Sequence, residues 1–158
     1  MRHRLAGKQL NRNTAQRLAL RRGLVTELFR HGAIQTTQAK AAAIRGLAEK
    51  LITTAKRSIV ADDPIKVMNA RRLVAAQLYG NEIVKKLFDE LAPKFVERTG
   101  GYTRVYKLGP RHGDAAEMVQ LELVIDGEVE EAKPDKKDKK TDDKKKDKRP
   151  EKKQDKKK

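Results

Sequence analysis

Basic side chains are unevenly distributed along this 158-residue chain, and its N-terminal segment is the extreme case. Residues 1–26 contain seven Lys or Arg side chains and no acidic one, namely Arg2, Arg4, Lys8, Arg12, Arg17, Arg21 and Arg22. Such side chains donate hydrogen bonds to phosphate oxygens, and the counterions released on phosphate neutralisation favour association with nucleic acids. The segment is therefore predicted to bind a polyanion.

The other titratable groups do not indicate catalysis. The chain has three histidines and no cysteine: His3 lies in the basic segment, His31 at an expected helix end, and His112 in a Gly-rich turn. No spacing of His and carboxylate residues matches a metal site, and the turn GPRHGD lacks the pattern of a phosphate-binding loop. We expect no enzymatic activity, metal, cofactor or small-molecule substrate. Without disulfides, the fold must depend on its apolar core.

A second basic group lies around two predicted strands. Arg104 and Lys107 belong to the first strand, Arg111 and His112 to the turn that follows it, and Lys40 to the start of a long helix. Each alone is compatible with ordinary solvated surface, but together with the acid-free segment they predict phosphate contacts. RNA fits better than DNA because the sequence has no helix-turn-helix, zinc-finger or basic-zipper pattern. The alternative is an architectural protein that condenses DNA through its basic ends.

The acid-free segment includes a predicted helix over residues 14–31, with Asn13 as its N-cap and Gly32 as its stop. One stripe at helical spacing reads Arg17, Arg21, Leu24 and Leu28. Burying an unpaired charge is strongly unfavourable, so we expect the first two turns to project from the body and to meet an external anion. In the alternative, these arginines pair with acids of the body, which has almost no spare negative charge.

The rest of the chain predicts an α+β fold. Apolar periodicity and turn residues indicate, in order, a strand at 33–37, a helix at 38–57, a helix opened by Asp63 and Pro64 and broken at Gly80, a helix at 82–91 that stops before Pro93, and strands within 102–108 and 118–125. The element order is therefore α-β-α-α-α-β-β. We expect two layers, with a small three-stranded mixed sheet and the helices packed on one face of it.

Composition divides the chain into an extended basic arm at 1–12, a globular domain at 13–126 and a Lys/Asp-rich tail at 127–158. Residues 27–132 hold 16 basic against 15 acidic side chains, whereas 133–158 hold 15 against 7. The tail has almost nothing to bury and is expected to be disordered. It either tethers nucleic acid by its charge or merely solvates the protein, and both alternatives stay open.

Composition also argues against several classes of protein. The longest apolar run is far shorter than the roughly 20 residues that a transmembrane helix needs, and the basic N-terminus lacks the apolar stretch of a signal peptide. We therefore expect a cytoplasmic protein. Aromatic residues make up 4% of the chain and tryptophan is absent, so we do not expect a platform of aromatic rings that stacks single strands.

Four motifs of this sequence occur in the same order in a known family. They are MRHR at residues 1–4, H-G-x-I-x-T-T-x-A-K-A at 31–41, A-E-K-L-I-T at 48–53 and G-G-Y-T-R-V-x-K-L-G-P-R-x-G-D-A at 100–115. Residues 1–125 resemble the bacterial large-subunit ribosomal protein seventeen family. The tail lies outside the resemblance. Two positions depart from the family pattern: Leu5, where a basic residue is common, and His112, where arginine is common.

The resemblance implies a structural protein of the large ribosomal subunit, without enzymatic activity. It implies binding to large-subunit ribosomal RNA on the solvent side near the polypeptide exit, beside neighbouring ribosomal proteins, with the arm and the first helix against the RNA. The full set of predicted RNA-binding residues is Arg2, His3, Arg4, Lys8, Arg12, Arg17, Arg21, Arg22, Lys40, Arg104, Lys107, Arg111 and His112.

Overall fold

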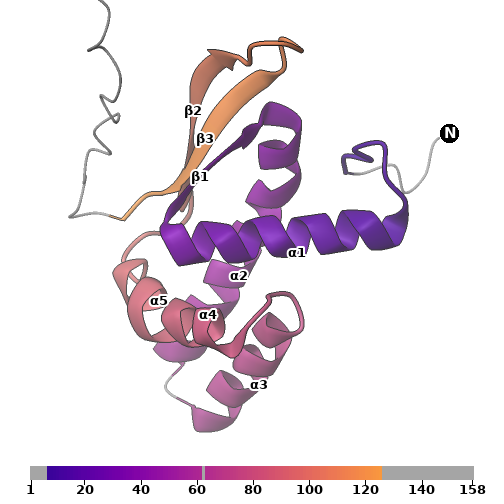
Figure 1. The fold of residues 1–158 in the computed structure, drawn as a ribbon. Coiled ribbons are helices and arrows are strands. Elements are labelled where there is room, and N and C mark those ends of the chain that lie inside the picture. Colours follow the sequence, from indigo (N-terminus) through magenta and orange to yellow (C-terminus); the bar gives the residue numbers. More distant parts are fainter. Residues whose placement is uncertain (1–6, 62, 126–158) are drawn as a thin grey trace, which may run out of the picture.

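The computed structural model describes residues 7–61 and 63–125 (Figure 1). In chain order its elements are α1 (Thr14–His31), β1 (Ala33–Thr37), α2 (Gln38–Val60), α3 (Pro64–Ala75), α4 (Asn81–Lys86), η1 (Leu87–Leu91), α5 (Ala92–Lys94), β2 (Thr103–Pro110) and β3 (Glu117–Leu123). They form the predicted α+β fold. The predicted contacts Arg2, His3 and Arg4 and the predicted tail at 127–158 lie outside the described residues. No helix in the described part is long and apolar enough to cross a membrane.

Local capping signals set the ends of the helices. Asn13 Oδ1 accepts a hydrogen bond at 2.8 Å from a backbone N–H in the first turn of α1, and Asp63 does the same at 3.0 Å ahead of Pro64 in α3. These caps satisfy backbone donors that have no partner within the helix. Helix α1 ends at Gly32, whose φ of 77° is left-handed. All of these ends agree with the prediction, whereas α2 runs to Val60, past its expected end at residue 57.

The chain departs from the prediction at Pro93. The helix expected to stop before Pro93 instead continues to Lys94, because α4, η1 and α5 follow one another without a break. Segment η1 is a π-helix, and the backbone N–H of Ala92 donates to Leu87 O, five residues back. Proline has no N–H and its ring crowds the preceding turn. The wider π turn directly before Pro93 accommodates both effects, so the proline opens a new helical turn instead of ending the helix.

Strand β3 is the central strand of the sheet, whose order is β1-β3-β2. It pairs antiparallel with both neighbours, so the prediction of a mixed sheet is wrong. Strands β1 and β2 run in the same direction, but β3 lies between them and they do not pair. The predicted hairpin of the last two strands is confirmed, with Lys107 opposite Val119 and Gly109 opposite Met118. Leu108 is therefore an extra residue that forms a bulge near the hairpin tip.

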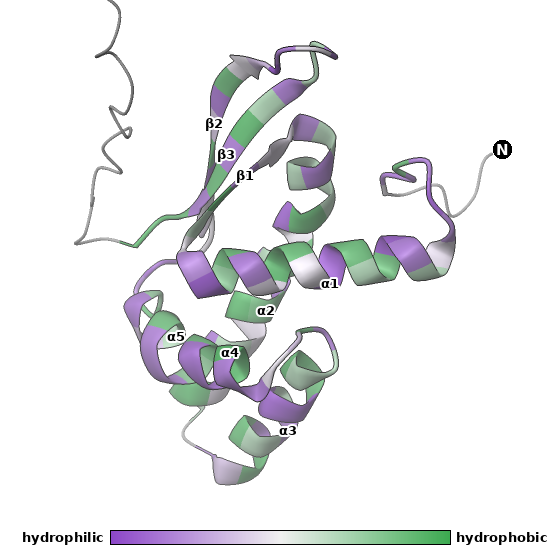
Figure 2. Cartoon of the chain, in the orientation of Figure 1, coloured by the Kyte–Doolittle hydropathy of each residue, from purple (hydrophilic) through white to green (hydrophobic). Residues whose placement is uncertain are grey.

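The core lies between the helices and one face of the sheet (Figure 1). In β3, Val119, Leu121 and Leu123 are buried and the residues between them are partly exposed. Figure 2 shows the corresponding alternation of hydrophobic and hydrophilic residues along this strand. Helix α2 packs its apolar stripe into the same core, with Ala41, Ile44, Ala48, Leu51, Ile52 and Ala55 buried. The two-layer arrangement agrees with the prediction.

Helix α3 lies at the opposite end of the molecule from the hairpin tip (Figure 1). It buries Ala70 and Val74, both on its predicted apolar stripe, and it exposes Ile65, Met68 and Leu73. One narrow face therefore holds α3 against the body, and its outer apolar residues add nothing to the core.

Two leucine-to-alanine substitutions test this description of the core. Leu28 of α1 is fully buried, whereas Leu73 has 65% of its surface exposed. We expect Leu28→Ala to lower the free energy of unfolding by about 2–5 kcal/mol, because it removes packed methyl groups and leaves a cavity. Leu73→Ala should change it by less than about 0.5 kcal/mol. Urea unfolding followed by circular dichroism measures both, and equal losses in the two variants would contradict the description.

Candidate nucleic-acid interface

The first half of α1 stands clear of the body of the protein. All buried residues of this helix lie in its second half: Val25, Thr26, Leu28 and Phe29. No residue from 7 to 24 is buried, and even Leu18 has 46% of its surface exposed. Figure 1 shows this half of the helix extending to one side of the domain. The predicted projection of the first two turns is confirmed.

Arg17 and Arg21 lie on this projecting half, about one helical turn apart. Arg17 Nη2 donates to Oγ1 of Thr14 at 3.1 Å, a contact within the same helix. Arg21 is partly exposed. Within residues 7–61 and 63–125 neither arginine forms an ion pair. The alternative in which acids of the body neutralise these arginines is therefore not what the structure shows.

The predicted extended arm, residues 1–12, is described from Gly7 onward, and there it makes a turn. The backbone N–H of Arg12 donates to Gln9 O at 3.2 Å. Two consecutive residues inside the turn have left-handed φ values of 54° and 50°. The described part of the arm is therefore not extended, because this local turn reverses it. Lys8 and Arg12 are both exposed.

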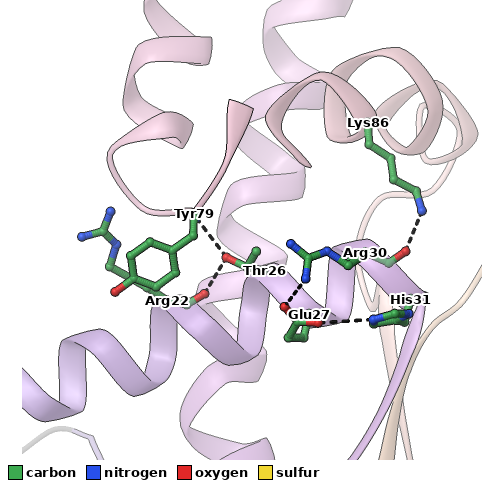
Figure 3. Close-up of polar contacts among 7 residues, drawn as sticks. All are labelled: Arg22, Thr26, Glu27, Arg30, His31, Tyr79 and Lys86. Atoms are coloured by element: carbon green, nitrogen blue, oxygen red, sulfur yellow. Dashed lines mark hydrogen bonds and ion pairs between the residues drawn. The ribbon is translucent and has the colours of Figure 1, made fainter. Parts of the chain in front are cut away.

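Arg22 differs from Arg17 and Arg21 because it packs against the body (Figure 3). Its Cζ lies 4.6 Å from the ring centroid of Tyr79, and its Nη2 donates to Leu78 O at 3.4 Å. Thr26 Oγ1 accepts from the backbone N–H of Tyr79 at 3.0 Å and donates to Arg22 O at 2.8 Å. The loop between α3 and α4 is thereby fixed to α1. Tyr79 was not among the residues predicted from the sequence. In the sequence it is only an aromatic residue in a turn, and the fold brings it beside α1.

Charged side chains hold the C-terminal end of α1 (Figure 3). Glu27 accepts a hydrogen bond from Arg30 at 2.7 Å and lies 3.3 Å from Nε2 of His31. Lys86 Nζ donates to Arg30 O at 2.7 Å. Arg30 and Lys86 are cations at this end, where positive charge complements the helix dipole. Glu27 is also the first acid of the chain. Because it pairs with Arg30 and His31, it does not neutralise Arg17 or Arg21.

Arg104 and Lys107 lie on opposite faces of the sheet. They are three residues apart in β2, and side chains alternate between faces along a strand. Lys107 is opposite Val119, which is buried against the helices, whereas Arg104 is opposite Glu122 on the other face. Arg104 also donates from Nη1 to the Tyr106 hydroxyl at 3.5 Å. One flat RNA surface therefore cannot contact both basic side chains.

The tip of the hairpin contains an ion pair that sequence analysis missed. Arg111 Nε and Nη2 donate to the two carboxylate oxygens of Asp114 at 3.0 and 2.6 Å. The hydrogen bonds from Arg111 and from the backbone N–H of Ala116 lower the pKa of Asp114 to about 2. The same pair raises the pKa of Arg111. The tip is therefore less positive than Arg111 and the exposed His112 suggest. The ion pair could have been predicted from the sequence, because Asp114 follows Arg111 by three residues.

Figure 1 places the basic features on one half of the molecule. They are the projecting half of α1, the β2–β3 hairpin and the first turn of α2, where Lys40 is partly exposed. Among the residues that the structure describes, no group of three or more His, Asp or Glu side chains could hold a metal ion. The surface supplies positive charge and hydrogen-bond donors, which is the chemistry of phosphate binding.

Comparison with known proteins gives one consistent result. Residues 20–124 match the family model described as ribosomal protein L17. The large ribosomal subunit protein bL17 of Clostridium perfringens is 52% identical over 117 residues, which cover 74% of this chain and 96% of that protein. The bL17 protein of Gemmatimonas aurantiaca is 48% identical over 125 residues, which cover 79% of this chain and 99% of that protein. The bL17 protein of Clostridium botulinum is 49% identical over 117 residues, covering 74% and 96% respectively.

The ion pair at the hairpin tip predicts an acidic titration. Carbon-13 NMR of the side-chain carboxyls should give Asp114 a pKa of about 2, and Arg111→Gln should raise it toward the ordinary value of 3.8. Because the pKa is lowered in the folded state, the contact stabilises the tip above about pH 4 and is lost as the pH falls toward 2. The control Lys107→Ala should leave this pKa unchanged. An ordinary pKa in the unsubstituted protein would contradict the pair.

Proposed function

Because this chain belongs to the ribosomal protein L17 family, whose members are structural constituents of the large ribosomal subunit, we propose that it binds and braces large-subunit ribosomal RNA. The family is not one of enzymes, which bears out the expectation from the histidines. As part of the ribosome, the protein acts in translation in the cytoplasm. The finer proposal is that α1 and the hairpin contact the RNA near the polypeptide exit, beside neighbouring ribosomal proteins.

The observation that carries this proposal is the projecting half of α1. It holds Arg17 and Arg21 away from the body, without an ion pair in the described part of the chain. Short helices without packing partners are only marginally stable in water, so an external surface that contacts this half would also stabilise it. Phosphate oxygens provide such a surface, because they accept hydrogen bonds from guanidinium groups and neutralise their charge.

The body of the protein supports this surface and contributes little charge. Residues 27–132 hold 16 basic and 15 acidic side chains, so the field around the core is nearly neutral. Attraction to RNA is therefore concentrated at the projecting features, and the orientation of the bound protein follows from where they lie. The body holds the projecting half of α1 and the hairpin in fixed positions relative to each other.

The hairpin adds a second and different contact. Since Arg104 and Lys107 lie on opposite faces of the sheet, we infer that the hairpin inserts between two RNA segments, each meeting one face. Strand β2 suits such a position because residues 104 to 108 are all exposed, although they are paired with β3. Arg111 keeps part of its hydrogen-bonding capacity bound to Asp114, so the hairpin's proposed main contacts are its strand residues.

Salt dependence of binding tests the α1 surface. The probe is large-subunit ribosomal RNA stripped of proteins, titrated with the full chain at several salt concentrations. Arg17→Ala and Arg21→Ala should each lower the salt slope by about one unit, because each removes one phosphate contact. Arg57→Ala, an exposed arginine at the last turn of α2, is the matched control and should leave the slope unchanged. An unchanged slope in the double variant would remove these two arginines from the interface.

Sedimentation of a cell lysate through sucrose tests the assignment to the large subunit. The protein should migrate with large subunits after a high-salt wash, because the proposed contacts along the helix and on both faces of the hairpin must all be lost before it dissociates. A DNA-condensing protein would instead be free or bound to the nucleoid. Recovery of the chain away from the large subunit would contradict the proposed function.

A further inference from the structure

Tyr79 is exposed, although its backbone is firmly held. It has 44% of its surface exposed, and it lies in the loop between α3 and α4. The hydrogen bond from its N–H to Thr26 and the burial of the preceding Leu78 fix the loop to α1. Neither contact uses the aromatic ring. The ring adds its contact with Arg22, but the backbone of the loop is held without it.

Arg22 orients the ring of Tyr79 and covers one side of it. Its guanidinium carbon lies 4.6 Å from the ring centroid, and Figure 3 shows the two side chains next to each other beside α1. Arg22 lies over one face of the ring and 44% of the Tyr79 surface is exposed, so we infer that the opposite face and the hydroxyl edge are open to a ligand. The structure thus presents a rigid aromatic face, backed by a cation.

The guanidinium of Arg22 is positioned but poorly satisfied. Its hydrogen bond to Leu78 O is long, at 3.4 Å, and its Nε is buried without a hydrogen-bond partner among the described residues. A guanidinium normally offers five N–H donors. The buried Nε cannot reach a ligand, but the Nη groups make only the one long hydrogen bond to Leu78 O within the described residues. A phosphate oxygen would accept a short, charge-assisted hydrogen bond from an accessible Nη N–H.

We propose that Tyr79 and Arg22 form a nucleotide-binding site, in which an unpaired base of ribosomal RNA stacks on the open face of Tyr79 and its phosphate meets Arg22. This site deepens the proposed function and rests on it. Proteins commonly recognise unstacked RNA bases by stacking them on aromatic rings and arginine planes. A base within a continuous duplex cannot reach such a ring, so the site selects a loop or a bulge.

The position of the site supports RNA as its occupant. Arg22 directly follows Arg21 and lies about 1.4 helical turns from Arg17, so the ring lies where the acid-free half of α1 enters the body. An RNA backbone that follows this half of the helix reaches Tyr79 there. The low aromatic content led us to expect no stacking platform, and the proposed site is an exception to that expectation for a single base.

The other aromatic residues make Tyr79 distinct. Phe29, Phe88, Phe95 and Tyr102 are buried, and the last two pack edge to face with centroids 5.2 Å apart. Tyr106 is exposed on the hairpin, where its hydroxyl accepts from Arg104. Three aromatic rings of the described residues have a cation–π contact: Tyr79, Tyr102 and Phe88. Of these three, only Tyr79 is exposed.

Tyrosine substitutions separate stacking from charge. With the full chain and protein-stripped large-subunit RNA, Tyr79→Ala should weaken binding by about 5- to 100-fold, because base–aromatic stacking is lost. Its salt slope should stay unchanged, since no charge is removed. Tyr79→Phe keeps the ring and should bind within about twofold of the unsubstituted protein. Arg22→Ala should lower both the affinity and the salt slope, the latter by about one unit.

Chemical probing then identifies the base. A nucleotide that is reactive to dimethyl sulfate in the free RNA should be protected by the unsubstituted protein and by Tyr79→Phe, and reactive again with Tyr79→Ala. If Tyr79→Ala proves unstable in thermal unfolding, Tyr79→Leu replaces it, because leucine keeps apolar bulk without a ring that stacks.

Four results would overturn the inference. Equal affinity and equal protection with Tyr79→Ala would show that the ring contacts no base. A binding loss in Tyr79→Ala that Tyr79→Phe shares would assign the effect to the hydroxyl. Protection that appears only in whole subunits, and not on the stripped RNA, would assign Tyr79 to a protein neighbour. Failure of the unsubstituted chain to bind the RNA would contradict the proposed function itself, and the inference with it.

Discussion

The packing of the second half of α1 is the constraint on which the rest of the structure depends. Leu28 and Phe29 are fully buried against α2 and the sheet, and Lys86 bonds to the last turn of the helix. Each backbone hydrogen bond joins one helical turn to the next. Packing of the second half of α1 on the body therefore also sets the direction of the first half. The charged half is held in a fixed direction while its guanidinium groups stay out of the core, where unpaired charge is strongly unfavourable.

The helix starts, the end of α1 and most of the buried residues could be predicted because their signals are local, whereas the ends of α2, α3 and the helix through Pro93 could not. A cap at Asn13 and a stop at Gly32 act within one turn, and the apolar stripe of α2 reports its buried face directly. The sheet topology could not be predicted in the same way. Strand order depends on which segments meet after folding, and nothing near residues 33–37 indicates that β3 lies beside them.

The candidate site was predicted unevenly for the same reason. Arg17, Arg21 and Arg22 could be identified because residues 1–26 contain no acid, which is a property of the linear sequence. The stacking of Arg22 on Tyr79 joins residues 57 positions apart, and Arg111 loses part of its free charge to Asp114 across a turn. Sequence reasoning found the basic residues. It could not tell which of them the fold already uses, because that depends on contacts made in three dimensions.

Charge and stacking would play different roles on this surface. Phosphate contacts from the arginines of α1 attract RNA without reading its sequence, and they allow the helix to bind at many positions along a backbone. A single ring that accepts an unpaired base has little attraction at a distance, but it is satisfied only where the RNA backbone is irregular. Because Tyr79 lies where the acid-free half of α1 enters the body, the same bound strand can meet both the arginines and the ring. Charge would then bring the strand to α1, and the ring would fix where along that strand the protein sits.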